Sequence, residues 1–253
     1  MTQHLDVEEL QNLLKTVVDE TTSITETLAS KASKILSKHA SEKNADIKLS
    51  TSERAALQKE IKKALSQSHY SQGTGFASYS PATQDEQDYW TLEWWYKKED
   101  QLQQAKLENY QNAQRFLDFR SFEWFHKPAQ NKSPCIHGPY VDYICNGAYT
   151  ITIAHPVMIH DHFIGVIATD ILVSALEKLL MPKLKNIKQK AVIMNDFILE
   201  SLLQMTLASE PGHYLKIRLI NSFSRNPVSL SSWLSSKKQR ILAFYSRFSV
   251  PPR

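Results

Sequence analysis

The stretch "AYTITIAHPVMIHDHFIGVIATDILV" covers residues 148–173 and decides the fold. In its first part, 148–159, apolar side chains alternate with polar or partly polar ones, and its last part, 163–173, is almost continuously apolar. Alternation with a period of two is typical of a half-buried strand, whereas a continuous apolar run is typical of a fully buried strand. The three residues "HDH" at 160–162 have the length of a tight hairpin turn. The stretch therefore predicts two long antiparallel strands.

The flanking residues add a strand before this hairpin and a helix after it. The run "GPYVDYI", which begins at residue 138, is a short alternating segment. The run "LVSALEKLLMP" at 172–182 has a helical pattern, and we expect the helix to end at Pro182 because proline cannot donate the next backbone hydrogen bond. A sheet flanked by helices that do not alternate with its strands indicates the α+β class.

The N-terminal third of the chain predicts two helices. Between residues 5 and 40, apolar side chains recur mostly three or four positions apart with no proline or glycine, which predicts one amphipathic helix about 50 Å long. This helix could lie along its own domain or form a coiled-coil homodimer. A second helix is expected from residue 51 to about 66, with Ser50 or Thr51 as its N-cap and Glu53 in its first turn. The glycines of "GTGFAS" at 73–78 end it, and a short strand follows.

Composition excludes several classes of protein. The chain has 253 residues, of which 42% are hydrophobic, so it is long enough to bury a core. No run of 18 apolar residues occurs, and the first residues lack the pattern of a signal peptide, so we expect no transmembrane segment and a cytoplasmic location. The two cysteines, Cys135 and Cys145, could form one bridge, but free thiols are the favoured interpretation.

Catalytic and cofactor motifs are weak. No GxSxG elbow or phosphate-binding loop is present, so the chain is not expected to be an enzyme or to need a cofactor. His155, His160 and His162, with Asp161, lack the spacing of a zinc site, so no metal is predicted.

The segment "RSFEWFHKPAQNKSPCIHGPYVDY" at 120–143 combines five aromatic rings with two carboxylates. Asp142 follows Tyr140 by two residues, which places both on one face of a strand. Asp170 interrupts an apolar strand, where a carboxylate needs a partner. Rings and carboxylates together favour a pocket for an ammonium group. The alternative is a hydrophobic core in which these aspartates pair with Arg115, Arg120 or Lys127.

A second aromatic group lies upstream in "YWTLEWWYKKE" at 89–99. Trp90, Trp94 and Trp95 cannot all share one face of a strand or helix, so we expect at least one of them to line a separate site.

Residues 5–182 resemble a Cache domain, the PAS-like sensor module of bacterial chemoreceptors and kinases. The resemblance is carried, in order, by the long first helix and by "EWFHKPAQ", "GPYVDY", "YTITIAHPV" and "FIGVIATDIL". It implies a curved antiparallel sheet with a long helix on one side and a ligand between the sheet and the loops above it. The sensor would then pass a change of shape along its first helix to a separate signalling protein.

The resemblance also implies ligand-binding positions. Trp124, Phe125, Tyr140 and Asp170 match residues of the amino-acid-sensing double-Cache pattern, but Phe122 stands where that pattern has the arginine that holds the ligand carboxylate. The pattern therefore favours an organic amine over an amino acid. The predicted ligand-binding residues are Trp95, Trp124, Phe125, Tyr140, Asp142 and Asp170.

The end of the chain differs from the rest. Residues 197–253 contain eight Lys or Arg and two Asp or Glu. We interpret 1–182 as the ligand-binding domain, 183–196 as the start of a truncated second Cache unit and 197–253 as a poorly ordered basic tail. Codons for "ESLLQMTL" at 200–207 also permit "GVIASNDP", a typical second-unit motif, in another reading frame, so the tail could be a frameshift product. The alternative function is an interaction protein whose basic tail binds a membrane or nucleic acid.

Overall fold

The computed structural model describes residues 2–38, 48–80, 89–105, 118–143, 147–184, 191–194, 216–219 and 243–244. It divides into two compact units, one of residues 19–173 and one of residues 1–18 with 174–253. Helix α1, Thr2–Ile35, contributes to both units. The predicted domain limits stay a prediction, because most residues after 184 lie outside the described part.

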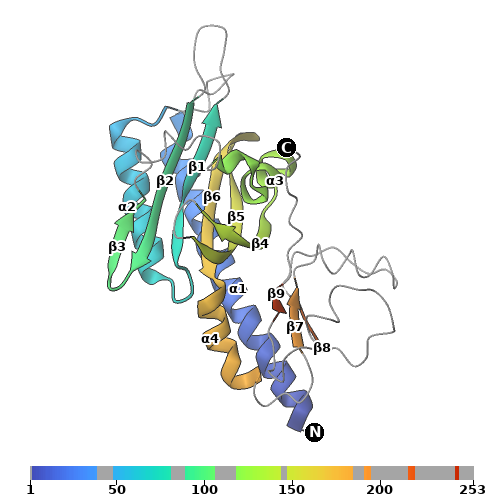
Figure 1. The fold of residues 1–253 in the computed structure, drawn as a ribbon. Coiled ribbons are helices and arrows are strands. Elements are labelled where there is room, and N and C mark those ends of the chain that lie inside the picture. Colours follow the sequence, from blue (N-terminus) through green and yellow to red (C-terminus); the bar gives the residue numbers. More distant parts are fainter. Residues whose placement is uncertain are drawn as a thin grey trace. The chain divides into compact units, whose positions relative to one another are not determined.

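The unit of residues 19–173 is built on an antiparallel sheet of six strands in the order β3-β2-β1-β6-β5-β4 (Figure 1). Strands β1 and β6, which are distant in sequence, pair with each other at the centre of the sheet. The strands are β1 Gly73–Ser80, β2 Tyr89–Lys98, β3 Gln101–Gln104, β4 Cys135–Asp142, β5 Ala148–Ile159 and β6 His162–Leu172.

The predicted central hairpin is confirmed. Strands β5 and β6 pair from Thr150 with Leu172 to Ile159 with His162. The two residues between them, His160 and Asp161, have φ values of 45° and 66°. Positive φ at both central residues matches the right-handed twist of the strands, which is why so short a turn can join them.

One face of the sheet, the helix face, is covered by α1 and α2 (Figure 1). Helix α2, Thr51–Gln67, begins as the sequence predicts: Glu53 donates its backbone N–H to Ser50 Oγ, and its carboxylate accepts from the Ser50 backbone N–H at 2.8 Å. The buried core on this face contains Leu28, Ala29, Ala32, Leu36, Leu49, Leu57, Ile61, Phe76, Val157, Ile159, Ile164 and Ile167.

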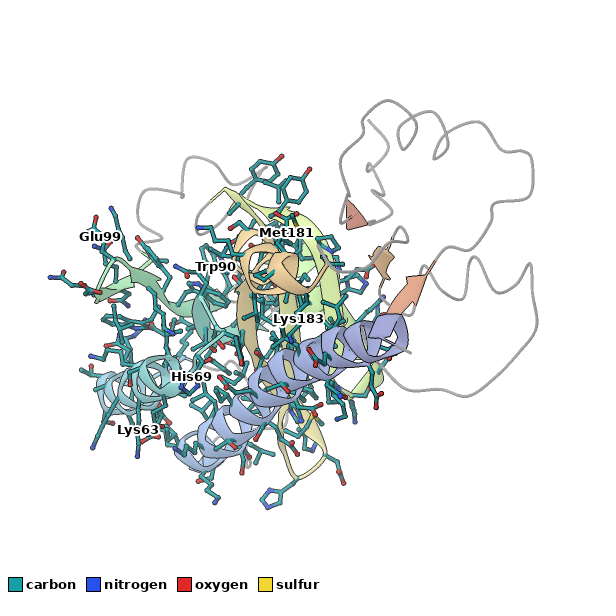
Figure 2. The ribbon with its side chains drawn as sticks, turned by 90° about the horizontal axis from the view of Figure 1, so that it is seen from below. Lys63, His69, Trp90, Glu99, Met181 and Lys183 are labelled. Carbon is teal, nitrogen blue, oxygen red and sulfur yellow. The ribbon has the colours of Figure 1, made fainter. Side chains whose placement is uncertain are left out.

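The other face, the site face, is covered by the short helix α3, Glu123–Asn131, after the 3₁₀ turn η3, Phe119–Ser121. Figure 2 places Trp90 on the side of the sheet away from α2. The buried core here contains Ala77, Leu92, Trp94, Phe119, Trp124, Phe125, Cys135, Tyr140, Ala154, Val166 and Ala168. The α+β fold with a long N-terminal helix on an antiparallel sheet is confirmed.

The second unit contains the start of α1, helix α4, Val173–Leu184, and a small sheet in the order β8-β7-β9. Its strands are β7 Ala191–Met194, β8 Lys216–Leu219 and β9 Ala243–Phe244. An ion pair of 2.6 Å joins Lys183 Nζ to Glu9 Oε2.

Helix α4 continues two residues beyond Pro182, so its predicted end is wrong. A proline in the last turn removes one backbone hydrogen bond, and the turn still closes. Apart from β8 and β9, the basic tail lies outside the described residues.

Candidate ligand-binding site

The site face has a floor of small residues. Gly73 and Gly75 of β1 pair with Asp170 and Ala168 of β6, and Ala168 pairs with Ala154 of β5. Because directly paired residues point to the same side of a sheet, these positions form adjoining rows under the aromatic side chains. Large rings from α3 and β2 can pack closely on such a floor.

Helix α3 places two aromatic side chains on the site face. Trp124, Phe125 and Pro128 are its buried residues, and the helix ends at Lys132 in the left-handed region, with φ 52°. Phe119, just upstream, contacts Phe125 edge-on at 4.9 Å between ring centroids. The irregular aromatic block of the sequence is thus a short helix with a proline inside it, followed by strand β4.

A bulge in β4 places two further rings on this face. His137 pairs with Thr152 and Tyr140 with Thr150, so β4 has one more residue than β5 over this interval. Residues three apart in a regular strand point to opposite faces, but the extra residue turns both side chains to the same one. The His137 and Tyr140 ring centroids are 4.7 Å apart. The predicted shared face of Tyr140 and Asp142 agrees with the register.

A chain of hydrogen bonds ends at the buried carboxylate of Asp170. Thr152 Oγ1 donates to Asp170 Oδ1 at 2.6 Å. Since the Thr152 hydroxyl has one proton, the Tyr140 hydroxyl donates to Thr152 over the 2.9 Å between them. Asp170 is 2% exposed. Burial raises its pKa well above the ordinary value of 3.8, and the nearby charge of Asp142 raises it further.

A second carboxylate at the edge of the site is strongly acidic. Glu123 Oε2 lies 3.2 Å from His137 Nδ1 and 2.8 Å from Lys127 Nζ. The hydrogen bond to His137, followed by that to Lys127, lowers the Glu123 pKa to about 2. These interactions fix the His137 ring beside Tyr140 and occupy the Lys127 ammonium.

The structure brings five of the six predicted ligand-binding residues to one face. Trp124, Phe125 and Tyr140 belong to the site-face core, and Asp142 and Asp170 are 3% and 2% exposed.

Trp95 is not brought to this cluster. It packs on the helix face, with Lys62 Nζ 4.6 Å from its ring centroid, whereas its neighbour Trp94 lies on the site face. The strand alternation that assigns these two tryptophans to opposite faces is visible in the sequence, but the sequence does not say which face is which.

The cations that could have paired with the aspartates are engaged elsewhere or not described. Arg120 forms a two-pronged pair with Asp118, with distances of 2.6 and 2.7 Å, and lies over the Tyr79 ring. Arg115 lies outside the described residues. Phe122 packs on Tyr140 at 5.4 Å between ring centroids, so an apolar ring stands where the resemblance expects an arginine.

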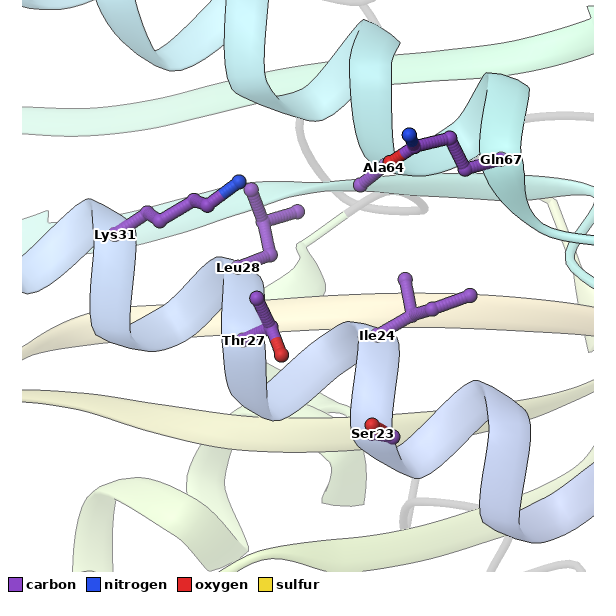
Figure 3. A pocket seen from close by; sticks show the side chains of 7 residues that line it. All are labelled: Ser23, Ile24, Thr27, Leu28, Lys31, Ala64 and Gln67. Atoms are coloured by element: carbon purple, nitrogen blue, oxygen red, sulfur yellow. The ribbon is translucent and has the colours of Figure 1, made fainter.

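Other candidate sites are weaker. Burial raises the pKa of Cys135 to about 12, which makes its thiol unreactive, and Cys145 lies outside the described residues. Within the described ranges, no three His, Cys, Asp or Glu residues are grouped to hold a metal ion. A hollow of about 100 Å³ lies between α1 and α2 (Figure 3), but its charged lining residue, Lys31, is paired with Glu60.

Comparisons with known proteins agree with this fold. Residues 57–178 match the family model of the methyl-accepting chemotaxis protein-like, first PDC sensor domain. No curated protein matches the chain. The helices in the described part of the chain include none that is both long and apolar enough to cross a membrane.

Solved sensor domains share the fold at low identity. The extracellular domain of soHK1S-Z6, named as a histidine kinase, is 12% identical with a TM-score of 0.54; the match covers 77% of this chain and 66% of that domain. The ligand-binding domain of the Campylobacter jejuni chemoreceptor Tlp3, solved with L-norvaline, is 12% identical with a TM-score of 0.52, over 82% of this chain and 72% of that one. The same domain with L-valine gives a TM-score of 0.51 at 12% identity, over 83% and 75%.

This chain thus spans less than two thirds of the kinase domain. The predicted cytoplasmic location stays a prediction. The match of residues 57–178 to this family model, the six-stranded sheet and the long first helix together support a Cache-type sensor domain in this part of the chain.

Proposed function

We propose that this ligand-sensing domain binds a small organic amine, within the wider class of amines and amino acids, on the site face. The observation that carries the proposal is the pair of buried carboxylates, Asp142 and Asp170, among the rings of Trp124, Phe125 and Tyr140. The domain would bind its ligand without transforming it.

A cation is the ligand that these groups favour. A buried carboxylate is costly in its charged form unless a positive charge lies next to it. The Asp170 carboxylate accepts a hydrogen bond from the neutral Thr152 hydroxyl, which supplies no such charge. An ammonium group would supply that charge and would also be attracted by the faces of the aromatic rings. Because these side chains are buried, ligand entry requires the rings to rearrange, which would give a sensor its change of shape.

The ligand carboxylate of an amino acid has weaker support. Tlp3 was solved with L-valine and L-norvaline, which supports amino acids as the wider class. In this chain, however, Phe122 stands at the expected arginine position and Arg120 is held by Asp118. An amine without a carboxylate needs neither an arginine at position 122 nor an unpaired Arg120.

The signal would pass through the centre of the sheet to α1. Asp170 and Thr169 are consecutive residues of β6 and point to opposite faces. On the helix face, Thr25 of α1 donates to Thr169 Oγ1 at 2.8 Å, and Thr169 also lies 2.8 Å from Thr74 Oγ1. A shift of β6 on ligand binding would therefore act directly on α1. Output through a separate protein, and dimerisation through α1, stay predictions.

Three matched compounds test the proposal by isothermal titration calorimetry. Isobutylamine is L-valine without its carboxylate, and isovalerate has a carboxylate but no amine. We expect isobutylamine to bind at least as tightly as L-valine, and isovalerate not to bind. Binding of isovalerate, or of none of the three, would contradict the amine proposal; binding of L-valine alone would leave an amino-acid sensor.

A further inference from the structure

The adjacent tryptophans of β2 lie on opposite faces of the sheet. Trp94 is 4% exposed and belongs to the site-face core, and Trp95 packs on the helix face under Lys62. Of these two tryptophans, only Trp94 can therefore contact a ligand on the site face.

Two glycines of β1 form the seat of the Trp94 indole. A Cβ at Gly73 would lie 2.9 Å from Trp94 Nε1, and a Cβ at Gly75 would lie 2.7 Å from Trp94 Cε3. Real Cβ contacts are longer than this, so the indole lies flat on β1 because both positions lack side chains. Strand β1 lies between β2 and β6 (Figure 1).

This seat places the indole nitrogen near Asp170. Nε1 is the part of the ring above Gly73, and Gly73 is the direct partner of Asp170 on β6. The Cβ positions of directly paired residues are about 5 Å apart. Nε1 of Trp94 and the side chain of Asp170 thus lie on the same face of the sheet, on either side of the Gly73 position of β1.

The Trp94 N–H also lacks a partner. Nε1 is buried, and within the described part of the chain it makes no hydrogen bond. Buried donors are nearly always satisfied in folded proteins, so one beside a candidate ligand site indicates an acceptor that arrives with the ligand. A neutral indole N–H suits a neutral oxygen, since Phe122 replaces the expected arginine and Arg120 and Lys127 are held by carboxylates.

We propose that Trp94 is a ligand-binding residue whose indole N–H donates to a hydroxyl or carbonyl oxygen of an organic amine, while the ammonium group of that amine lies at Asp170. The ligand class is therefore an amine that carries a neutral oxygen acceptor near its nitrogen. This inference rests on the proposed function and adds the residue that would select among amines.

Two isosteric probes separate the inference from the proposed function. Ethanolamine and propylamine differ only in a hydroxyl in place of a methyl group. Calorimetry on the full chain should show ethanolamine binding about fivefold more tightly than propylamine, the ratio expected for one additional neutral hydrogen bond of about 1 kcal/mol. Trp94→Phe should reduce the ratio to about one, whereas Trp95→Phe, which removes a buried indole N–H from the other face, should leave it unchanged.

Each outcome has one meaning. If neither amine binds the wild-type chain, the proposed function fails. If both bind and Trp94→Phe keeps the preference for ethanolamine, or if wild type has no preference, the role of Trp94 is overturned. A measurement on wild type needs no variant to fold: the Trp94 indole ¹⁵N–¹H resonance should shift with ethanolamine more than with propylamine, and equal shifts would overturn the inference.

Discussion

Replacing Asp170 with asparagine should change ligand binding and stability in opposite directions. Asp170 is 2% exposed and accepts a 2.6 Å hydrogen bond from Thr152, which an asparagine oxygen can also accept. The substitution therefore keeps the shape and the hydrogen bond, and it removes the ability to carry a negative charge.

Binding should weaken because an ammonium ligand loses its buried counter-charge. A hydrogen bond to a charged group contributes about 1.5–3 kcal/mol, which corresponds to about a 10- to 150-fold increase in the dissociation constant. Stability should rise at neutral pH. The pKa of Asp170 is raised in the folded state, so the fold binds more protons than the unfolded chain above pH 3.8, and its stability falls as pH rises from there toward the folded pKa. Asparagine does not titrate and escapes this loss.

The two effects need two assays on the same protein samples. Calorimetric titration with isobutylamine at pH 7 measures binding, and urea unfolding of wild type and Asp170→Asn between pH 4 and 7 measures stability. A variant that merely misfolds would lose both properties. The reasoning is refuted if the variant binds the amine within about threefold of wild type, or if it is less stable than wild type at pH 7.

Three further predictions concern other parts of the molecule. Thr25→Val removes a buried hydroxyl that joins α1 to β6 and should lower the free energy of unfolding by about 1–2 kcal/mol in urea. Thr16→Val, at an exposed site on the same helix, should change it by less than about 0.5 kcal/mol. Because Glu123 is partly solvated, Glu123→Gln should lower the free energy of unfolding by under about 1 kcal/mol at pH 6. This difference from wild type should vanish as the pH falls from 4.5 to about 2, the folded-state pKa of Glu123, which is lowered mainly by His137. A difference that does not depend on pH would contradict this assignment. Cys135 should resist iodoacetamide at pH 8 until urea unfolds the chain, as mass spectrometry of the digested protein would detect; rapid native labelling would contradict its burial.

The regular elements could be predicted from the sequence because each has a local signal. The hairpin of β5 and β6 follows from alternation and a turn of fixed length, and the start of α2 follows from the capping box at Ser50 and Glu53. These signals depend on neighbours within a few residues, so no knowledge of the tertiary structure is needed.

The site could be predicted less completely because its geometry depends on irregular backbone. The β4 bulge that turns His137 toward Tyr140 has no regular period, and the helix in the aromatic block contains Pro128. The sequence assigns Trp94 and Trp95 to opposite faces, but which face receives α3 is decided by packing of the whole sheet. For this reason the sequence predicts Trp95 for the site, whereas the structure places Trp94, and not Trp95, on the site face.

The central claim is that the site face binds an organic cation, and a thermal-shift screen of the full chain against amines, amino acids and small carboxylates tests it most directly. A ligand at 100 times its dissociation constant stabilises the fold by about 2.7 kcal/mol, which raises the melting temperature by several degrees. We predict such shifts with amines, smaller or equal shifts with amino acids, none with carboxylates, and loss of the shifts in Asp170→Asn. A chain that melts cooperatively and shifts with carboxylates, or with none of these compounds, would contradict the account.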